Sequence, residues 1–387
     1  MYVQRQPGLF PGELKRRDGA QLPFPLNASN RTFSYMARGV IYHLFRALKL
    51  HPGATVLVPD YHSGVEIWAM RAAGANLRYY PVRGDMEVDM DELRRLCTPD
   101  VRVLYVVHYL GWSQPLPELT DLCRERGLVM IEDCALSFLS EDGGRPLGAT
   151  GDYSFYCLYK TLPVPNGGLL TQNNRVLEDL ARLELEPCSL ASLAACSAEL
   201  FFEAVRGRSD SAGKALFWLK RRMGQMLSVA GVRRLPLGDI SPDFSTFGLD
   251  IAKMNIAMSE FCRRLIESFD YEMIRERRRR NFADLRARLP EAPMPRDDLK
   301  PGVCPLFFPL LVEDKTAAAR AFQERGVNVT EFWNYGHPEA ELHTGAAAQS
   351  LRRHVLELPI HQDVTPEQVE YMADVALELK HHFRKAA

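Results

Sequence analysis

Apolar runs and amphipathic segments alternate along the first half of the chain. Short, continuously apolar runs predict buried strands at 55–59, 77–82, 101–107 and 127–133. Apolar residues that recur at helical spacing predict helices at 33–50, 65–73, 90–97 and 117–126. Apolar strands separated by helices are typical of a mostly parallel sheet that is covered on both faces. The pattern therefore predicts a doubly wound α/β fold.

The pattern changes to mainly helix after residue 171, which indicates more than one structural unit. We expect an N-terminal arm over 1–30, rich in Pro, Gly and Asn; such arms often lie across a partner subunit. A large domain is expected over 31–245, with a helical insertion at about 172–232. A connecting helix and a smaller α+β domain are expected over 246–387. The basic stretch 214–223 is interpreted as the solvated edge of a packed helix; contact with a membrane is the alternative.

Composition and charge narrow the class of protein. The chain has 387 residues, 46% hydrophobic and 25% charged, with a formal net charge of −1, so no basic field indicates nucleic acid. Its apolar runs are too short to span a membrane, and no apolar stretch follows the charges near its start, which favours the cytoplasm. Eight cysteines without CxxC pairs indicate reduced thiols and no structural zinc. One or two helices are predicted over 251–289, with the run Arg275 to Arg280 as a solvated face.

An acidic residue and a lysine stand out in the segment 131–171. Asp133 closes an apolar strand, and Lys160 lies in an aromatic segment that ends in a double glycine. A pyridoxal phosphate enzyme needs such a pair, because a lysine forms the Schiff base and a carboxylate keeps the pyridine nitrogen protonated. Asp133 could instead be a helix N-cap and Lys160 a surface lysine, but aromatic neighbours in sequence disfavour the surface role.

Two further segments are candidates for binding the cofactor. Ala37, Arg38 and Gly39 lie at the start of a predicted helix, where free N–H groups and an arginine suit a phosphate. The alternative is a plain helix start with a solvated arginine. Tyr61 and His62 follow a predicted strand at its carboxyl end, where open α/β sheets place their ligands.

Several short motifs occur in an order and spacing that resemble a known family, the DegT/DnrJ/StrS aminotransferases. These are fold-type-I pyridoxal phosphate enzymes best known for aminating keto sugars on nucleotides. The matching motifs are Phe45–Leu48, Pro52-Gly53, Val56–Pro59, His108 with Gly111, Ile131-Glu132-Asp133, Gly148, Gly151-Asp152, Lys160, Gly167-Gly168 and Leu358–His361. The resemblance extends from about residue 33 to the C-terminus and is that of a divergent member.

The resemblance implies roles for individual residues. Lys160 matches the Schiff-base lysine and Asp133 the partner of the pyridine nitrogen. The segment 37–39 matches the phosphate loop, although Arg38 stands where a small hydroxyl residue is usual.

The same resemblance suggests further residues that contact the cofactor. Tyr61 or His62 is expected to stack on the cofactor ring, with a core-capping aromatic as the alternative, and His108 is a further candidate contact. Cys157 stands where many fold-type-I enzymes have a phosphate-binding serine. Leu136 replaces the usual glutamine near the phenolic oxygen, and Ser137 is its candidate substitute.

The implied function is a ping-pong aminotransferase. An amino acid, by analogy glutamate, donates an amino group that passes to a ketone or aldehyde acceptor, a nucleotide-linked keto sugar or another biosynthetic compound. The resemblance also implies a homodimer with shared active sites. The alternatives are a pyridoxal phosphate-dependent lyase or dehydratase and a non-catalytic regulatory protein. Lys160 disfavours the sugar-deoxygenating variant, in which a histidine replaces the lysine, and the retained Asp133–Lys160 pair disfavours a regulatory role.

Overall fold

A computed structural model describes residues 1–10, 12, 21–209, 211–213, 215–216, 218, 222, 251–334 and 336–385. Its central sheet has seven strands in the order β1-β9-β8-β5-β4-β2-β3. Their bounds are β1 Arg31–Ser34, β2 Thr55–Pro59, β3 Asn76–Tyr80, β4 Val101–Val107, β5 Val129–Asp133, β8 Tyr153–Cys157 and β9 Gly168–Gln172. Strands β3, β2, β4, β5 and β8 are parallel, and β9 and β1 add two antiparallel pairings. The predicted mostly parallel sheet is confirmed.

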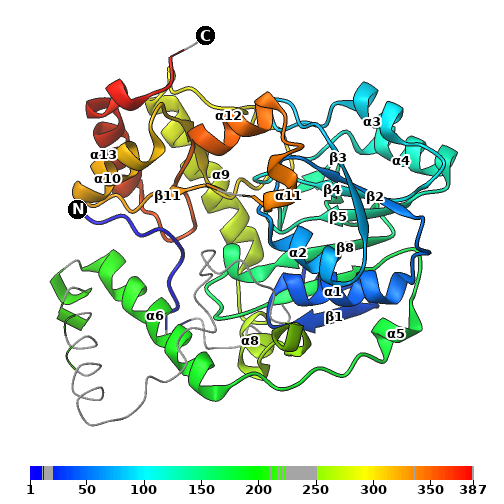
Figure 1. The fold of residues 1–387 in the computed structure, drawn as a ribbon. Coiled ribbons are helices and arrows are strands. Elements are labelled where there is room, and N and C mark those ends of the chain that lie inside the picture. The colour runs from blue at the N-terminus through cyan, green and yellow to red at the C-terminus, as the bar shows by residue number, and fades with distance from the viewer. Residues whose placement is uncertain are drawn as a thin grey trace.

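Helices on both faces bury the sheet. They are α1 Ala37–Leu48, α2 Val65–Ala72, α3 Met90–Leu96 and α4 Leu116–Arg126. The strand order requires α2 to lie on the opposite face from α3 and α4, because parallel crossovers are right-handed. Figure 1 shows α1 and α2 on one side of the strands and α3 and α4 toward the other. Strand β2 is buried along its whole length, as its continuous apolar sequence predicts.

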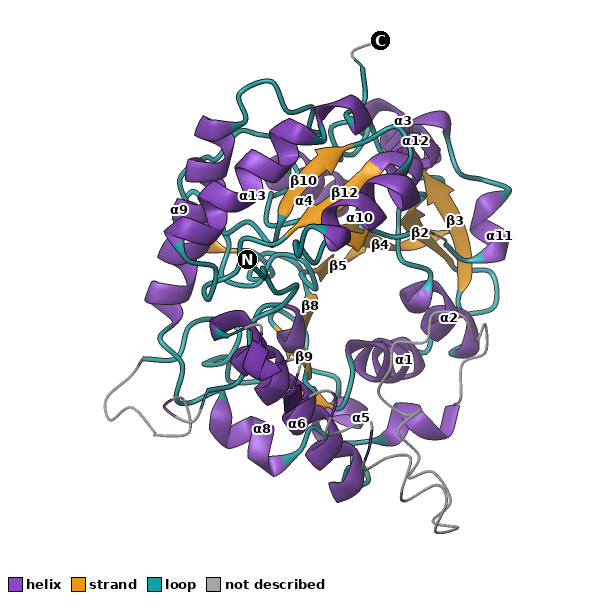
Figure 2. Ribbon diagram, turned by 90° about the vertical axis from the view of Figure 1, so that its left-hand side faces the viewer, coloured by secondary structure: helices purple, strands orange, loops and turns teal. Residues whose placement is uncertain are grey.

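The C-terminal elements form a second layer beside the central sheet (Figures 1 and 2). A three-stranded antiparallel sheet has the order β10-β12-β11, with β10 Phe308–Leu311, β11 Thr330–Glu331 and β12 Val355–Leu358. The helices here are α9 Tyr271–Arg288, α10 Lys315–Glu324, α11 Pro338–Glu341, α12 Ala346–His354 and α13 Pro366–Glu378, whereas α8 Glu260–Leu265 lies near β1 (Figure 1). Shorter elements lie between these: β6 Glu141–Asp142, β7 Arg145–Pro146, and the 3-10 helices η2 Leu158–Lys160, η4 Ile251–Asn255 and η5 Lys380–His382.

The first residues of the arm bind to the chain's own C-terminal part. Val3 forms a parallel bridge with Val327, and the Gly8 N–H donates to Asp363 at 2.8 Å. The Gln4 carbonyl contacts the His361 ring at 2.9 Å. These residues of the arm therefore pack on the C-terminal part of their own chain. Residues 11 and 13–20 of the arm lie outside the described part.

The region after β9 is helical where it is described. It contains α5 Glu178–Ala181 and α6 Leu190–Arg208. Six of the ten residues of the basic stretch 214–223 lie outside the described residues, as do all positions from 223 to 250. Among the described residues, no helix is both long and apolar enough to cross a membrane.

Two local predictions differ from the structure. The segment predicted as a helix from residue 33 begins with the end of β1, which pairs with β9, and α1 starts at Ala37. The run Arg275–Arg280 is only partly a solvated face. Arg278 is 1% exposed, and Arg275 forms an ion pair with Glu141. A six-residue run covers more than one helical turn, so some of its members must face the core.

Candidate active site

Asp133 lies at the carboxyl end of β5, buried at the centre of the sheet. Its Oδ2 accepts a hydrogen bond from the Tyr105 hydroxyl at 2.8 Å, and its Oδ1 accepts one from the Ala135 N–H at 2.9 Å. Burial, together with the charge of Glu66, raises the pKa of Asp133 to about 6, against the lowering effects of Ala135, Lys160 and Tyr105. A buried carboxylate that two hydrogen bonds hold in place is suited to bind a protonated nitrogen.

Lys160 ends the short η2 helix directly after β8. Its charge acts on Asp133 and Cys157, so the structure brings the two predicted catalytic residues into one site. The carbonyl that follows it, of Thr161, accepts hydrogen bonds from Arg278 Nη2 at 3.1 Å and Gln362 Nε2 at 3.2 Å. Two buried side chains from the C-terminal half therefore fix the backbone next to Lys160.

The N-terminus of α1 borders the same site. Its first turn has no acidic residue, and its N-cap, Met36, makes no side-chain capping bond. The Ala37 N–H donates to the thiol of Cys157, which charge interactions link to Lys160. A Cβ on Gly168 would stand 2.5 Å from the Ala37 nitrogen, so only glycine allows β9 this close to the helix start.

Arg38 adds a positive charge to this helix start. Its Nη2 contacts the Met36 sulfur at 3.2 Å, and its Nε is buried without a hydrogen-bond partner among the described residues. The unpaired Arg38 donor, a helix start without an acidic residue or a side-chain cap, and the neutral Cys157 thiol, whose pKa burial raises, suit a phosphate. The residues present thus fit pyridoxal phosphate. The α1 start and Arg38 would hold the phosphate, Asp133 the ring nitrogen, and Lys160 the carbonyl carbon.

The two residues predicted to stack on the ring are both fully buried. The Tyr61 ring lies among Tyr109, Phe332 and Trp333, with centroids 5.5, 6.3 and 5.0 Å away. This setting favours the packing alternative for Tyr61. His62 has both ring nitrogens buried without a hydrogen-bond partner in the described part of the chain, and its pKa is lowered well below the usual value by burial, Arg352 and His337.

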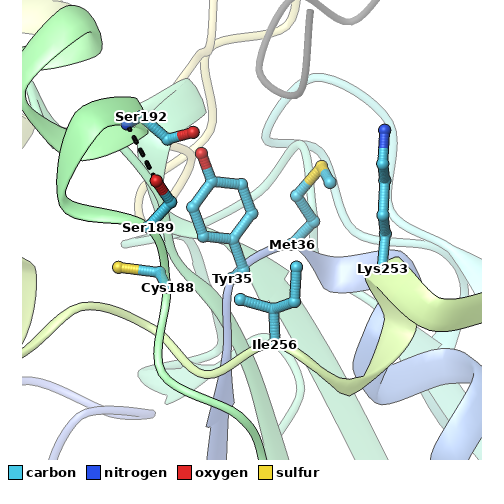
Figure 3. A pocket seen from close by; sticks show the side chains of 7 residues that line it. All are labelled: Tyr35, Met36, Cys188, Ser189, Ser192, Lys253 and Ile256. Carbon is cyan, nitrogen blue, oxygen red and sulfur yellow. Dashed lines mark hydrogen bonds between the residues drawn. The ribbon is translucent and has the colours of Figure 1, made fainter. Parts of the chain in front are cut away.

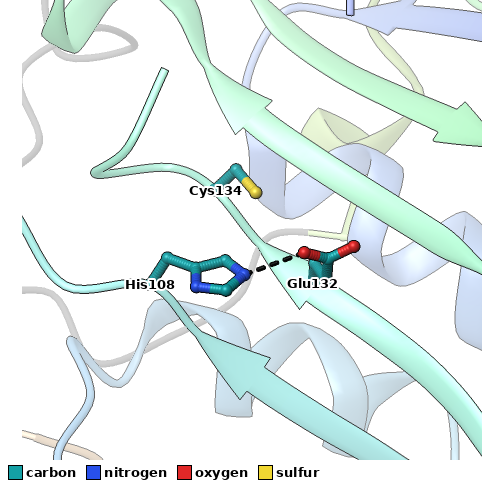
Figure 4. Close-up of side chains that lie close together, drawn as sticks. All are labelled: His108, Glu132 and Cys134. Atoms are coloured by element: carbon teal, nitrogen blue, oxygen red, sulfur yellow. Dashed lines mark hydrogen bonds and ion pairs between the residues drawn. The ribbon is translucent and has the colours of Figure 1, made fainter. Parts of the chain in front are cut away.

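His108 belongs to a network on the other side of β5 (Figure 4). Its Nε2 donates to Glu132 Oε2 at 2.9 Å, and its Nδ1 accepts from the Gln114 N–H at 3.1 Å. Successive residues of a strand point to opposite faces, so the Glu132 side chain points away from that of Asp133. The structure therefore does not bring His108 together with the Asp133–Lys160 pair.

Glu132 holds a loop through three further hydrogen bonds. It accepts from the N–H groups of Gly148, Thr150 and Gly151 at 2.9, 2.9 and 2.5 Å. Burial opposes its ionisation, but the hydrogen bond and charge of His108 and these N–H groups lower its pKa. His108, Glu132 and Cys134 are close enough to share a metal ion. The Glu132 carboxylate already accepts four hydrogen bonds. We therefore interpret the cluster as structural, because it fixes the loop that carries Gly148 and Gly151.

Ser137 lies in the turn after β5. Its N–H donates to the Cys134 carbonyl at 3.1 Å, and its hydroxyl lies beside the Cys134 thiol. Cys134 shares the Glu132 face, so the Ser137 hydroxyl is directed away from Asp133. Leu136 is a buried core residue. The Ser137 hydroxyl therefore lies on the opposite side from Asp133, and Leu136 offers no hydrogen bond.

A small pocket lies next to the N-cap of α1 (Figure 3). Its lining residues are Tyr35, Met36, Cys188, Ser189, Ser192, Lys253 and Ile256. Figure 3 shows the Tyr35 hydroxyl directed toward the two serines. The serine pair is the N-cap of α6, where Ser189 accepts from the Ser192 N–H. Segments more than 200 residues apart in sequence form this pocket, so no sequence pattern predicts it.

Comparisons with solved structures define the class of the fold. The structure matches a sugar aminotransferase of Streptococcus pneumoniae with a TM-score of 0.68 at 15% identity, covering 98% of this chain and 99% of that one. It also matches the Helicobacter pylori aminotransferase PseC, with a TM-score of 0.67 at 14% identity over 99% and 100% of the two chains. The chain therefore has the fold of pyridoxal phosphate-dependent sugar aminotransferases.

Sequence comparisons show which family part of the chain resembles. Residues 40–200 match the DegT/DnrJ/EryC1/StrS aminotransferase family, which confirms the predicted family resemblance. Over 144 residues the chain is 28% identical to a GDP-perosamine synthase of Vibrio cholerae, covering 36% of this chain and 39% of the relative. Over 145 residues it is 30% identical to a dTDP-4-dehydro-2,3,6-trideoxy-D-glucose 4-aminotransferase of Saccharopolyspora spinosa, covering 35% and 36%. The matched segment thus spans under two fifths of these relatives.

Proposed function

We propose that the chain is a pyridoxal phosphate-dependent aminotransferase that aminates a keto sugar or a related polyhydroxylated carbonyl compound. The observation that carries the proposal is the convergence of Asp133, Lys160 and the uncapped N-terminus of α1 at one end of the sheet. Each of the three suits a different part of the cofactor. The family match over residues 40–200 supports the same assignment.

The chain's own groups have distinct tasks in this reaction. When bound, pyridoxal phosphate supplies an electron sink that makes a carbon–hydrogen bond of the bound amine acidic. Asp133 holds a proton on the ring nitrogen, and Tyr105 and Ala135 keep its carboxylate in place. Lys160 Nζ holds the cofactor and moves the proton between the two reacting carbons.

The substrate class is inferred from the relatives. The names of the two curated relatives above describe nucleotide-sugar amination, and a third relative, from Acidithiobacillus ferrooxidans, is a UDP-N-acetyl-3-dehydro-α-D-glucosamine 3-aminotransferase. We therefore propose a nucleotide-linked keto sugar as the acceptor and glutamate as the donor. A homodimer with shared active sites and a cytoplasmic location complete the proposal, and both rest on the sequence analysis.

Transfer of the amino group from donor to acceptor tests this function. Purified protein loaded with pyridoxal phosphate is incubated with L-glutamate and a dTDP-linked 4-dehydro-6-deoxyhexose. We expect formation of 2-oxoglutarate and of an amino sugar, detected by mass spectrometry, in equal amounts. Release of ammonia or dehydration of the sugar without a new amino group would indicate lyase chemistry and contradict the proposal.

A further inference from the structure

Glu357 is a charged residue in an otherwise apolar strand. Strand β12 and the residues that follow read Val-Leu-Glu-Leu-Pro-Ile, and every neighbour of Glu357 in this stretch is buried. Glu357 is itself half-buried, and its carboxylate forms no hydrogen bond or ion pair within the described ranges. A carboxylate in such surroundings costs free energy unless a partner binds it. A bound substrate would be such a partner.

The register of the small sheet determines where Glu357 points. Leu358 pairs with Phe308, whose ring contacts Phe282 of α9 at 5.3 Å, so this face of the sheet packs on the helix. Glu357 alternates with Leu358 and therefore points to the opposite face. Its cross-strand partner Thr330 lies on that same face.

This second face is directed toward the active site. Phe332, two residues after Thr330, contacts the Tyr61 ring at the carboxyl end of β2. The charge of Glu357 acts on Tyr61 and on Lys160. The hydroxyls of Thr330 and Tyr61 are both buried without a hydrogen-bond partner among the described residues. Three polar groups without partners among the described residues, from β11, β12 and the turn after β2, therefore lie around Glu357, on which the charge of Lys160 acts.

The charges nearby decide what kind of group can bind there. Arg5, Lys160 and Lys315 all act on Glu357 as positive charges, whereas burial alone raises its pKa to about 7. Lys315 is already bound to the carbonyls of Phe332 and Arg352 at 2.6 and 2.7 Å. Three cations around one carboxylate disfavour a fourth cation in the ligand. Neutral O–H donors fit the carboxylate and both hydroxyls.

We propose that Glu357, with Thr330 and Tyr61, forms a hydroxyl-binding subsite that selects acceptors carrying hydroxyl groups next to the carbonyl carbon. This subsite rests on the proposed amino transfer, and it assigns the specificity of that reaction to the C-terminal sheet. Glu357 is the main determinant, because hydrogen bonds to a charged acceptor are the stronger ones. A sugar that lacks these hydroxyls leaves the three groups without partners and binds poorly.

Two matched acceptors and three variants test the subsite. The acceptors are dTDP-4-dehydro-6-deoxy-D-glucose and dTDP-4-dehydro-2,3,6-trideoxy-D-glucose, which differ by two hydroxyl groups. The variants are Glu357→Gln, Thr330→Val and the control Glu331→Gln. Glu331 lies on the other face of β11, where it contacts Thr316 and Asn334. Cofactor absorbance and melting temperature check that each variant is folded and loaded.

The subsite predicts a loss of discrimination. The native protein should favour the hydroxylated acceptor by about 100-fold or more in kcat/KM. Glu357→Gln should lower kcat/KM for this acceptor by about 10- to 100-fold and Thr330→Val by about 3- to 10-fold, with little change for the trideoxy acceptor. Glu331→Gln should behave as the native protein. Equal losses on both acceptors, or none, would overturn the subsite.

Binding separates this proposal from the proposed function. Dissociation constants of the same two nucleotide sugars are measured by calorimetry on the loaded proteins, or on the unloaded ones if no chromophore forms. Tighter binding of the hydroxylated sugar, lost in Glu357→Gln, supports the subsite even where no amino group is transferred. Equal binding of both sugars, or binding of neither, overturns it. A protein that never takes up pyridoxal phosphate overturns only the proposed function.

Discussion

Glu132 and Asp133 are adjacent carboxylates in different environments. The surroundings of Glu132 suit a structural role, and those of Asp133 suit a chemical one. Four hydrogen bonds surround Glu132 and lower its pKa against the effect of burial. Asp133 has two, and burial raises its pKa to about 6. The first carboxylate is stabilised by the fold alone. The second forms no ion pair within the described residues, so a protonated nitrogen of a ligand can bind it.

We predict that Asp133→Asn stabilises the cofactor-free protein. The pKa of Asp133 is higher in the folded than in the unfolded chain, so its ionisation destabilises the fold above pH 6, by about 3 kcal/mol at most. The variant should therefore gain about 1–3 kcal/mol in free energy of unfolding at pH 8, measured with urea. The gain should vanish near pH 4, where the aspartate is protonated. Catalysis should be lost at every pH.

Glu132→Gln is the matched comparison and should have the opposite sign. The lowered pKa means that the ionised Glu132 stabilises the fold above its unfolded pKa of 4.5, and that this contribution is lost as the pH falls. The variant should lose about 2–4 kcal/mol at pH 8 and less at pH 5. A stabilised Glu132→Gln, or a destabilised Asp133→Asn at pH 8, would contradict this division of roles.

At the scale of elements, α9 contributes a buried arginine that holds the segment after Lys160. Arg278 donates to the carbonyls of Leu306 and Thr161 at 2.8 and 3.1 Å, so it joins η2 to the loop before β10. Its Nε has no hydrogen-bond partner within the described ranges, and burial lowers its pKa. The helix thus positions the lysine without touching the reacting atoms.

Replacing this arginine should affect both stability and the position of Lys160. Arg278→Met should lower the free energy of unfolding by about 3–5 kcal/mol, because two buried carbonyls lose their donor. Arg278→Lys should lose less stability but still shift the absorbance maximum of the bound cofactor. Arg277→Met, on the same helix, should leave both quantities unchanged. Arg278 has no role in positioning Lys160 if all three variants share the native spectrum.

Comparison of the predicted with the observed helices and strands shows how much of the fold can be predicted from the sequence. Strand β4 has the predicted bounds, 101–107, because six of its seven positions are apolar and buried and only Arg102 is exposed. The sequence pattern does not predict β1, because its four residues continue directly into an amphipathic pattern and so resemble the start of a helix. Asp133 and Lys160 are recognisable from local sequence. Arg278 cannot be recognised in this way, because no feature of the sequence distinguishes the buried arginine from the others in the run. Glu357 can be recognised, because it is a single acidic residue in an apolar strand.

At the scale of the whole molecule, the site is built from both layers. Asp133 and Lys160 come from the central sheet, and Gln362, Arg278 and Glu357 come from the C-terminal half. Two exposed apolar side chains flank the pocket beside α1: Leu190 is 80% and Ile251 53% exposed. Exposed apolar groups close to a binding site suit a subunit contact. This surface is where we expect the second copy of the proposed homodimer.

Leu190→Glu should therefore weaken the dimer. Sedimentation at micromolar concentration should give the mass of two chains for the native protein and a shift toward one chain for the variant, because a buried, unpaired charge disfavours the contact. The affinity for pyridoxal phosphate should fall in parallel if the second chain completes the site. Leu342→Glu is the control, since Leu342 is 84% exposed and lies in the C-terminal layer. A native monomer with full activity would exclude the shared site.

The absorbance of the purified protein tests the central claim, that Lys160 and Asp133 form a pyridoxal phosphate site, most directly. Native protein loaded with the cofactor should absorb in the visible range and bleach when L-glutamate is added, with one equivalent of 2-oxoglutarate per site. Lys160→Ala should show no such protein-bound chromophore and no bleaching. Retention of the native spectrum and of its response to L-glutamate in Lys160→Ala would contradict the account.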